Sequence, residues 1–329
     1  MITNFGTTPS GETVQMITLE GGDLRAEVVT YGAALRSLYL DGFEPSLALG
    51  AETLEDLIGP LRYFGSTVGR VANRIKNAEY HLGGQRFELE KNFVGKHTLH
   101  GGDSGVGGQV WSIADMGSDF VTLSLSEESG HGGFGGEIAM QVTYRLNGRA
   151  LEVVMTATSD SETPCNLAHH SYFNLDGEGN VDGHRLRVDA ETFVPLDDEL
   201  IPTGDPVSVE GTKLDFRVMR PLGDVHYDNN LCVSAERVAL REVARVEGAK
   251  SGISLTVETT EAGLQIYNAL HLTEEGTRGL GGRIYRTHAG LALETQVWPD
   301  AINREGYPDC IIGPNKPYES ITRYVFARD

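Results

Sequence analysis

Short segments in which apolar and polar residues alternate recur along most of this chain, and they constrain its fold more than any other feature. Alternation with a period of two places apolar side chains on one face of a β-strand. The 41 glycines supply turn positions between these segments and favour strands over a helical bundle. We predict strands over residues 14–20, 24–31, 34–40, 119–126, 137–146, 150–158, 184–194, 264–271, 291–298 and 319–327.

Turn signals indicate how several of these strands are joined. Residues 79–90 read as a hairpin around Leu82-Gly83-Gly84, and Leu146-Asn147-Gly148-Arg149 is a second hairpin turn. Residues 240–259 read as a third hairpin, although 234–246 is compatible with a helix in isolation. Residues 52–58 are the one segment that we expect to form a short helix. The pattern predicts an all-β fold, a large antiparallel β-sandwich.

Length and charge limit the classes of protein. A chain of 329 residues suggests about two domains from length alone, but all-β folds of this size can be single units, and we expect one domain over 1–329. Lys and Arg number 27 against 47 Asp and Glu, a formal net charge of −20. This disfavours nucleic acid and anionic membrane surfaces as partners, because both need clustered positive charge.

Neither cysteine spacing nor the chain start indicates export or membrane insertion. Cys165, Cys232 and Cys310 are widely spaced and form no CxxC pair. No apolar run reaches 18 residues, and Met1 to Gly6 have neither the basic nor the apolar region of a signal peptide. We therefore expect a cytoplasmic protein.

The strand at 291–298 carries a single acid among small and apolar residues. Alternation places Glu294, Gln296 and Trp298 on one face. An amide can hydrogen-bond hydroxyls, an indole can cover a pyranose ring and a carboxylate can take a proton. The segment is compatible with a sugar-binding surface and equally with a strand that carries an ordinary solvated acid.

Further motifs in a fixed order decide between these readings. Together they closely resemble the aldose 1-epimerases, the galactose mutarotase family, and the resemblance extends over nearly the whole chain. The motifs are Phe5-Gly6, Tyr31-Gly32-Ala33, Tyr63-Phe64-Gly65, Gly69 through Ile75, Thr98 through Gly102, Asn166 through Leu175, Gly263 through Asn268, Glu294 through Asp300 and Tyr318 through Phe326.

The resemblance implies a fold and a reaction. Members of the family form a twisted β-supersandwich with the sugar site in an open cleft, and they interconvert the α and β anomers of free aldoses such as galactose and glucose. The reaction needs one base and one acid, and no cofactor or metal. By the resemblance, Glu294 is the base, His170 the acid, and His100 lies near the ring oxygen. A nearby carboxylate favours a protonated His170 near neutral pH.

The same resemblance assigns the residues that bind the sugar. Arg74 and Asn73 belong to the Ala-Asn-Arg-Ile run, and Asp228 matches an acid that accepts hydrogen bonds from hydroxyls. Gln265 and Tyr267 share one strand face and are expected to line the cleft. Arg70 is left open between a site residue and a structural ion pair. Tyr172 and Trp298 are left open between core residues and a platform under the sugar.

The sequence departs from the family pattern at three places, none of which replaces the acid or the base. They are Gly105 through Gly108, Pro314-Asn315-Lys316 and His169, where the family often has Asn. We expect them to affect sugar preference, loop conformation or a subunit contact. The oligomeric state is left open between a monomer and a homodimer.

Other functions remain to be compared. A zinc site built from His97, His100, His169 and His170 would need the four rings to converge. A glycosidase would use two carboxylates, with Glu294 and Asp228 as the pair. A non-catalytic sugar-binding module is the main alternative from another class, and a mutarotase for a pentose or another aldose, or for a phosphorylated hexose, is an alternative within the family. A nucleotide-dependent sugar epimerase is disfavoured, because the sequence has no strand-linked GxGxxG and no GxxxxGK[ST].

Overall fold

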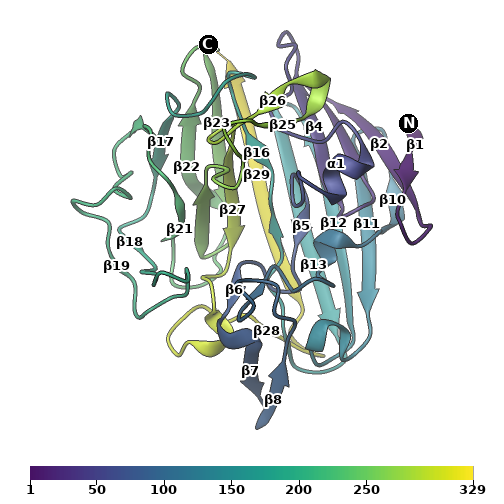
Figure 1. Ribbon diagram of the computed structural model, residues 1–329, viewed down its shortest axis with the longest axis vertical. Coiled ribbons are helices and arrows are strands. Elements are labelled where there is room, and N and C mark those ends of the chain that lie inside the picture. Colours follow the sequence, from purple (N-terminus) through teal and green to yellow (C-terminus); the bar gives the residue numbers. More distant parts are fainter. Residues whose placement is uncertain (329) are drawn as a thin grey trace.

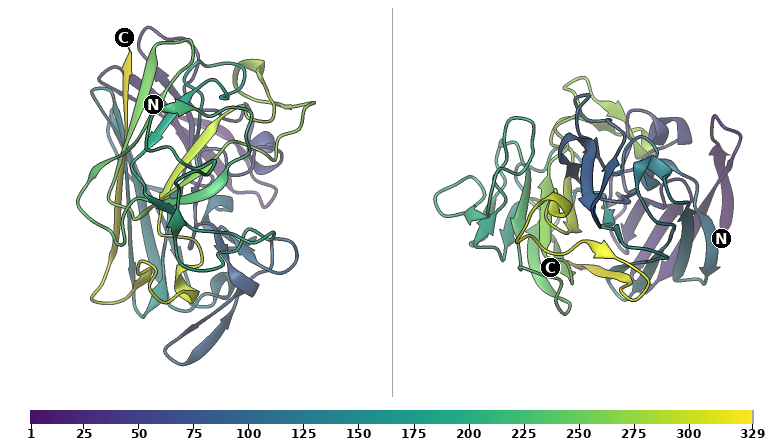
Figure 2. Two further views of the ribbon diagram at one scale, coloured as in Figure 1. Left: turned by 90° about the vertical axis from the view of Figure 1, so that its left-hand side faces the viewer. Right: turned by 90° about the horizontal axis from the view of Figure 1, so that it is seen from below.

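The computed structural model describes residues 1–328 and contains two layers of antiparallel strands (Figures 1 and 2). One layer is a nine-stranded sheet in which the C-terminal strand β29 is central. In spatial order its strands are β10 (Ser112–Met116), β11 (Phe120–Glu127), β12 (Ile138–Asn147), β13 (Ala150–Ser159), β29 (Tyr318–Arg328), β23 (Ile253–Thr259), β22 (Arg241–Glu247), β17 (Arg185–Val188) and β20 (Arg220–Pro221).

The other layer consists of two sheets. A four-stranded sheet contains β1 (Ile2–Thr7), β2 (Thr13–Gly21), β3 (Leu24–Val29) and β4 (Ala34–Leu40), and β2 and β3 contact β11 and β12. A six-stranded sheet contains, in order, β16 (Tyr172–Phe173), β27 (Leu291–Gln296), β24 (Gly263–Tyr267), β21 (Asp228–Cys232), β18 (Thr192–Phe193) and β19 (Val207–Ser208). The Tyr324 hydroxyl of β29 donates to the Leu293 carbonyl of β27 at 3.1 Å, which links the two layers.

Short elements connect and cover these sheets. Two-stranded ladders pair β5 (Thr67–Val68) with β15 (Ala168–His169), β6 (Arg74–Ile75) with β9 (Thr98–Leu99), β7 (Glu79–Leu82) with β8 (Gln85–Glu88), β14 (Thr163–Pro164) with β28 (Ile311–Ile312), and β25 (Thr277–Arg278) with β26 (Ile284–Tyr285). The α-helix is α1 (Leu54–Ile58), and the 3-10 turns are η1 (Lys76–Ala78), η2 (Val106–Gly108), η3 (His131–Gly133), η4 (Leu280–Gly282) and η5 (Ala301–Asn303).

The main core lies between the layers and is formed by alternate residues of the long strands. In β12 every second side chain from Ile138 to Leu146 is buried, and these side chains share one cluster with Leu19 of β2 and Leu293 of β27. Burial of apolar surface on both inner faces is the main stabilising contribution in such a sandwich. The prediction of an all-β, antiparallel β-sandwich is confirmed.

Most of the predicted elements are present. The hairpins at 79–90 and around Asn147-Gly148 form as expected, and 52–58 contains α1, whose N-cap Thr53 accepts from the Asp56 backbone N–H at 3.2 Å. The hairpin at 240–259 forms from β22 and β23, so a helix over 234–246 is wrong. The strand predicted at 264–271 ends at Tyr267, and Ala269 has a left-handed φ of 58°.

The single strand predicted over 184–194 is wrong, because the chain changes layers within it. Val188 of β17 pairs with Ala244 in the nine-stranded sheet, whereas Thr192 of β18 pairs with Cys232 in the six-stranded sheet. The alternation of apolar and polar residues continues across the change of layer, because each half of the segment buries one face. β1 was not predicted.

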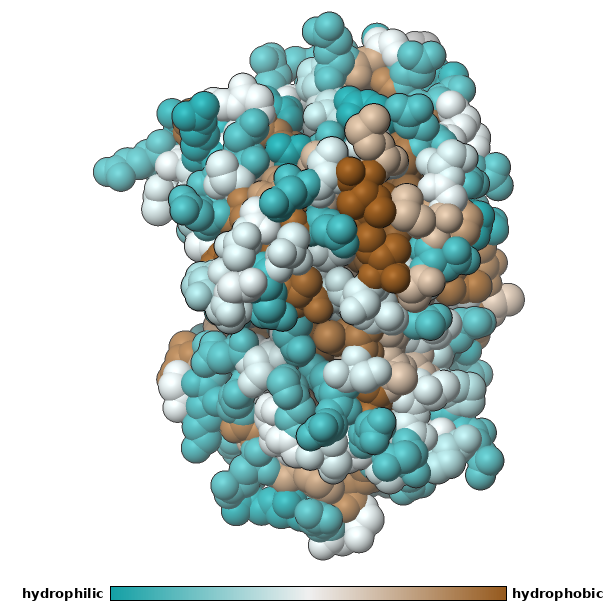
Figure 3. Space-filling view, turned by 90° about the vertical axis from the view of Figure 1, so that its right-hand side faces the viewer, coloured by the Kyte–Doolittle hydropathy of each residue, from teal (hydrophilic) through white to brown (hydrophobic). Residues whose placement is uncertain are grey.

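The side of the molecule that carries β1 and α1 is covered largely by hydrophilic residues, with a group of hydrophobic ones near its middle (Figure 3). No helix among residues 1–328 is both long and apolar enough to cross a membrane.

Candidate active site

Three adjacent strands of the six-stranded sheet form the floor of a pocket. Antiparallel pairing places Gln265 of β24 opposite Glu294 of β27, and Asp228 of β21 opposite Tyr267 of β24. Side chains of directly paired residues, and of every second residue along a strand, project from the same face. The register therefore brings the Gln265 amide, the Tyr267 phenol and the carboxyl groups of Asp228 and Glu294 to a single face.

The β6–β9 ladder contributes one wall of this pocket. Arg74 pairs with Leu99, so Asn73 and His100 lie at the same end of the ladder. The Asn73 backbone N–H donates to Nδ1 of His100 at 3.1 Å, and this leaves Nε2 as the protonated nitrogen of a neutral ring. Gly101 follows with φ of 85°, and a Cβ there would lie 2.0 Å from the Gly69 carbonyl oxygen, so only glycine fits this turn.

His170 stands next to the carboxyl group on the floor. It follows directly after β15, and its Nε2 lies 3.5 Å from Oε1 of Glu294. Its ring is surrounded by Tyr172 at 5.0 Å, His100 at 5.4 Å and Tyr63 at 6.3 Å between ring centroids. These aromatic neighbours hold the imidazole in place beside Glu294.

All eight residues expected to bind or transform a sugar line one cavity of about 360 Å³. Its volume is near the lower end of the range of small-molecule sites. Glu294, His170, His100, Arg74, Asn73 and Gln265 are buried, and Asp228 and Tyr267 are half-buried. The eight residues are Asn73, Arg74, His100, His170, Asp228, Gln265, Tyr267 and Glu294.

A chain of polar contacts crosses one side of the cavity. Nη2 of Arg74 donates to Oδ2 of Asp228 at 3.0 Å, and Nε2 of Gln265 donates to Oδ1 of the same carboxylate at 2.5 Å. Nη1 of Arg74 also donates to Oδ1 of Asn73 at 3.2 Å. Among residues 1–328, Nε of Arg74, Oε1 of Gln265 and Oε2 of Glu294 have no hydrogen-bond partner, so the cavity wall presents both donors and acceptors.

Burial shifts the proton affinities of the central pair in opposite directions. It lowers the pKa of His170 to about 4 and, helped by the negative charge of Asp228, raises the pKa of Glu294 well above its usual range. Burial and the neighbouring His170 also lower the pKa of His100. The neutral forms of both groups of the pair are therefore favoured. This is opposite to the expectation that Glu294 holds His170 protonated near neutrality.

Two residues of the 291–298 segment do not reach the cavity. Gln296 is buried outside the lining, and Trp298 packs with Val194, Cys232 and Ala262, where its Nε1 donates to the Ala262 carbonyl at 3.0 Å. Trp298 is a core residue, so its reading as a sugar platform is wrong. Tyr172, which was left open in the same way, does line the cavity.

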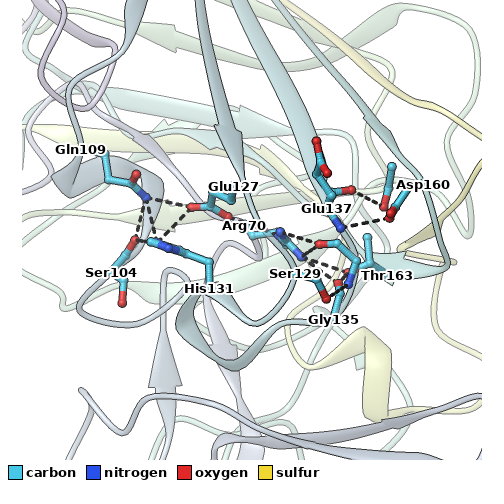
Figure 4. Close-up of polar contacts among 12 residues, drawn as sticks. Arg70, Ser104, Gln109, Glu127, Ser129, His131, Gly135, Glu137, Asp160 and Thr163 are labelled. Carbon is cyan, nitrogen blue, oxygen red and sulfur yellow. Dashed lines mark hydrogen bonds and ion pairs between the residues drawn. The ribbon is translucent and has the colours of Figure 1, made fainter.

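Arg70 belongs to a separate buried network (Figure 4). Its Nε lies 3.4 Å from Oε2 of Glu127, and its Nη1 donates to the carbonyl of Gly135 at 2.9 Å and to Oγ1 of Thr163 at 3.2 Å. The other carboxylate oxygen of Glu127 accepts from Gln109 at 2.8 Å. The guanidinium is 1% exposed and is absent from the cavity lining, which supports the structural reading of Arg70.

The four histidines considered for a zinc site do not converge. Nδ1 of His97 accepts from the Asn77 backbone N–H at 2.8 Å, and His169 lies against Tyr144, with its Nδ1 3.2 Å from the hydroxyl. A different group, His100, His170 and Glu294, has ligand atoms within 4.8 Å of one another, a spacing that could also hold an ion.

Several cavity residues were not assigned from the sequence. Tyr63 was noted only as part of a motif, and Phe93 and His271 were not noted. The Phe93 ring lies 4.6 Å from the Arg74 guanidinium carbon, and Nδ1 of His271 lies 2.9 Å from the Tyr267 hydroxyl. Phe93 comes from an irregular loop, and His271 lies beyond the end of β24 in a segment that was predicted to continue the strand. The left-handed φ of 73° at Tyr63 indicates a constrained position, but it is visible only in the structure.

Comparisons with known proteins identify the family to which the chain is similar. A family model described as aldose 1-epimerase matches residues 15–325. The galactose mutarotase of Bos taurus is 36% identical over 337 residues, which cover 98% of this chain and 97% of that protein. The aldose 1-epimerase of Escherichia coli K12 is 32% identical over 340 residues, with 98% and 97% covered.

Solved structures show the same fold. A crystal structure of an aldose epimerase homologue from C. elegans superposes with a TM-score of 0.89 at 31% identity, and the match covers 95% of this chain and 98% of that chain. The galactose 1-epimerase from Lactobacillus acidophilus has a TM-score of 0.85 at 22% identity over 100% and 98% of the two chains, which shows the fold alone.

Proposed function

The chain belongs to the aldose 1-epimerase family of isomerases, and we propose that it interconverts the α and β anomers of free galactose and glucose with Glu294 as base and His170 as acid. The observation that carries the proposal is the separation of 3.5 Å between His170 Nε2 and Glu294 Oε1 inside a cavity lined by hydroxyl-binding groups. The proposed substrates follow the names of the relatives.

The proposed reaction consists of two proton transfers and one rotation. Glu294 takes the proton of the C1 hydroxyl while His170 delivers a proton to the ring oxygen, and the bond between C1 and that oxygen breaks. The open-chain aldehyde turns about its C1–C2 bond. Reversal of both transfers closes the ring on the other face of C1 and returns each proton to its source.

Glu294 and His170 share one transferable proton, and the reaction depends on which of the two groups holds it. A neutral imidazole beside a carboxylic acid contains as many protons as an imidazolium beside a carboxylate, so the resting and reactive states differ only by transfer within the pair. Sugar hydroxyls that donate to Glu294 Oε2 would stabilise the carboxylate, and the positive charge of Arg74 acts in the same direction. We propose that sugar binding therefore moves the proton from Glu294 to His170.

The remaining lining residues would orient the sugar. The Arg74 guanidinium and the Asp228 carboxylate form a paired donor and acceptor, a suitable surface for two neighbouring hydroxyls. Nε2 of His100, the protonated nitrogen in its neutral form, would donate to the ring oxygen or to a hydroxyl beside it. Tyr63 and Tyr172 provide apolar ring surface next to His170.

The contacts of Asp228 disfavour a glycosidase. Both of its oxygens already accept hydrogen bonds from Arg74 and Gln265. A carboxylate whose two oxygens are both engaged in this way is poorly placed to attack an anomeric carbon. Glu294 therefore has His170, rather than a second free carboxyl group, as its chemical partner.

Polarimetry of freshly dissolved α-galactose and α-glucose tests the proposal. Wild type should accelerate the approach to anomeric equilibrium with and without excess chelator, and Glu294→Gln should lose about 10²- to 10⁴-fold in kcat. A matched control is Glu247→Gln on β22, a strand of the nine-stranded sheet, which should keep the wild-type rate.

Sugar binding must be measured beside the rate to separate an enzyme from a binding module. Isothermal titration calorimetry is suitable, because Trp111 and Trp298 are both buried outside the cavity and do not report on it. Binding without acceleration for galactose, glucose, arabinose and xylose would support the binding module. A near-normal rate of Glu294→Gln would remove Glu294 from the role of base, and a rate abolished by chelator would indicate a metal at His100, His170 and Glu294.

A further inference from the structure

A second cluster of ionisable side chains lies in a cavity of about 450 Å³ that shares no lining residue with the sugar pocket. Nδ1 of His288 is 2.7 Å from Oδ1 of Asp182 and 4.0 Å from Oδ1 of Asp224. The three ligand atoms all lie within 4.8 Å of one another. An imidazole nitrogen and two carboxylate oxygens at this spacing form a set of metal-binding type.

Backbone hydrogen bonds hold together the three segments that carry Asp182, Asp224 and His288, independently of these side chains. The Val181 N–H donates to the His288 carbonyl at 2.8 Å, and the Gly223 N–H donates to the Asp182 carbonyl at 2.8 Å. Nδ2 of Asn180 donates to Oδ2 of Asp182 at 2.8 Å, so that only Oδ1 turns towards His288. Outer contacts of this kind orient the ligands of metal sites.

The hydrogen bond between His288 and Asp182 leaves the nearby Asp224 carboxylate without a partner at this ring. Nδ1 of an imidazole carries at most one proton, yet two carboxylates approach it. The His288 ring is 4% exposed, and its Nε2 has no hydrogen-bond partner within residues 1–328. A second imidazole, His226, packs edge-on against it at 5.3 Å between centroids. A cation between the carboxylates would remove their mutual repulsion and use the nitrogen as a ligand.

We propose that Asp182, Asp224 and His288 bind a divalent cation of the zinc type. The imidazole selects for zinc-like ions over calcium and magnesium, which prefer oxygen ligands. Tetrahedral bonds of about 2.0–2.1 Å separate ligand atoms by about 3.3 Å. The Asp182 and His288 atoms would move slightly apart and the Asp224 side chain, which is 93% exposed, would move inward. Water would complete the coordination, and the ion takes no part in mutarotation.

Calorimetric titration of the metal-free full-length protein with zinc chloride tests this site. Wild type should bind one ion, and His288→Asn and Asp224→Asn should each weaken binding by about 100-fold or more, since even outer-contact changes cost 10- to 100-fold. Asparagine suits position 288, because it tolerates the left-handed φ of 62° found there. The exposed Asp224 can be changed without risk to the core.

His170→Asn is the matched control, since it removes the other histidine cluster. It should bind zinc as wild type does, and excess galactose should not displace the ion from wild type. Zinc should also raise the melting temperature of wild type but not of Asp224→Asn. Three results overturn the proposal: no zinc binding by wild type, wild-type affinity in Asp224→Asn, or loss of binding in His170→Asn, which would place the ion in the sugar pocket.

Discussion

Arg70 and Arg74 are four residues apart in the same motif, and both are buried beside a carboxylate, but their surroundings differ. Arg70 contacts Glu127 and the carbonyls of Gly135 and Gly136, and all of these lie outside the sugar pocket (Figure 4). Arg74 contacts Asp228, which lines the pocket. The first cation is enclosed by the protein, whereas the second has part of its hydrogen-bonding capacity directed into a cavity.

This difference teaches how to separate structural from functional buried charges. Burial alone does not decide, since the Arg70 and Arg74 side chains are 1% and 8% exposed. The hydrogen-bond partners of each guanidinium group, and whether they line a cavity, distinguish the two roles. A guanidinium held by backbone carbonyls stabilises the loops that supply them, and one that shares its carboxylate with Gln265 in a cavity is placed to exchange contacts with a ligand.

The two buried acids provide the strongest test of this comparison. Glu294→Gln should lose about 10²- to 10⁴-fold in kcat and keep its fold, because it removes a proton acceptor but no ion pair. Glu127→Gln should keep a near-normal rate per folded molecule and lower the melting temperature, because it leaves Arg70 uncompensated. Polarimetry and thermal unfolding of both variants measure this. A large loss of rate in Glu127→Gln would mean that the two regions are coupled.

Removal of Arg70 should be the most destabilising change in its region. Arg70→Met leaves a buried carboxylate and several carbonyls without their donor, and breaking such a pair costs about 3–5 kcal/mol. A double variant, Arg70→Met with Glu127→Leu, should recover part of this loss because no charge remains buried. Urea unfolding of the single and double variants gives the coupling free energy. Equal stabilities of Arg70→Met and wild type would refute the structural role.

The fold was largely predictable because strand burial leaves a period of two in the sequence. The prediction failed at 184–194, where the same alternation serves two different sheets. Periodicity shows that a face is buried but not which partner buries it. The short strands β6 and β9, which contribute to the pocket wall, and β15, which directly precedes His170, have two residues each and no detectable period.

The site was predictable only as far as the motifs extend. They named the eight residues that meet in the cavity, but their catalytic and binding roles stay predictions. The sequence left Trp298 open between a core residue and a sugar platform. The structure decides for the core, because β27 ends at Gln296 and the chain then carries Trp298 into a core cluster. The proton affinity of His170 was misjudged because the sequence shows the neighbouring acid but not the burial, and burial is the largest cause of the shift.

Arg74→Lys should have a smaller effect than the changes above. Lysine keeps the charge beside Asp228 but loses the planar pair of donors, and hydrogen bonds to charged groups are worth about 1.5–3 kcal/mol, or roughly 10- to 100-fold. We expect the loss mainly in KM and in sugar affinity, with little change in melting temperature. Arg70→Lys is the control and should leave KM unchanged. A loss confined to kcat would instead place Arg74 in the proton-transfer step.

The smallest effect concerns acid sensitivity. Burial lowers the pKa of His169 to about 3 and of His170 to about 4, and also lowers that of His100. Below the unfolded value of 6.5 the unfolded chain binds protons that these buried rings do not, so stability falls as pH decreases from 6.5 towards 4. The pKa of Glu294 is raised, so above pH 4.5 its contribution to stability increases as pH decreases. This cancels the contribution of about one of the three histidines.

His169→Asn isolates one of these groups, because His169 lies outside the cavity lining and asparagine cannot titrate here. The slope of unfolding free energy against pH between 4.5 and 6.5 should decrease by up to about 1.4 kcal/mol per pH unit. Urea unfolding at several pH values measures the slope, and any constant loss from the smaller side chain does not affect it. An unchanged slope would show that His169 is protonated in the folded protein, and that burial there does not exclude charge as it does for the pair in the sugar pocket.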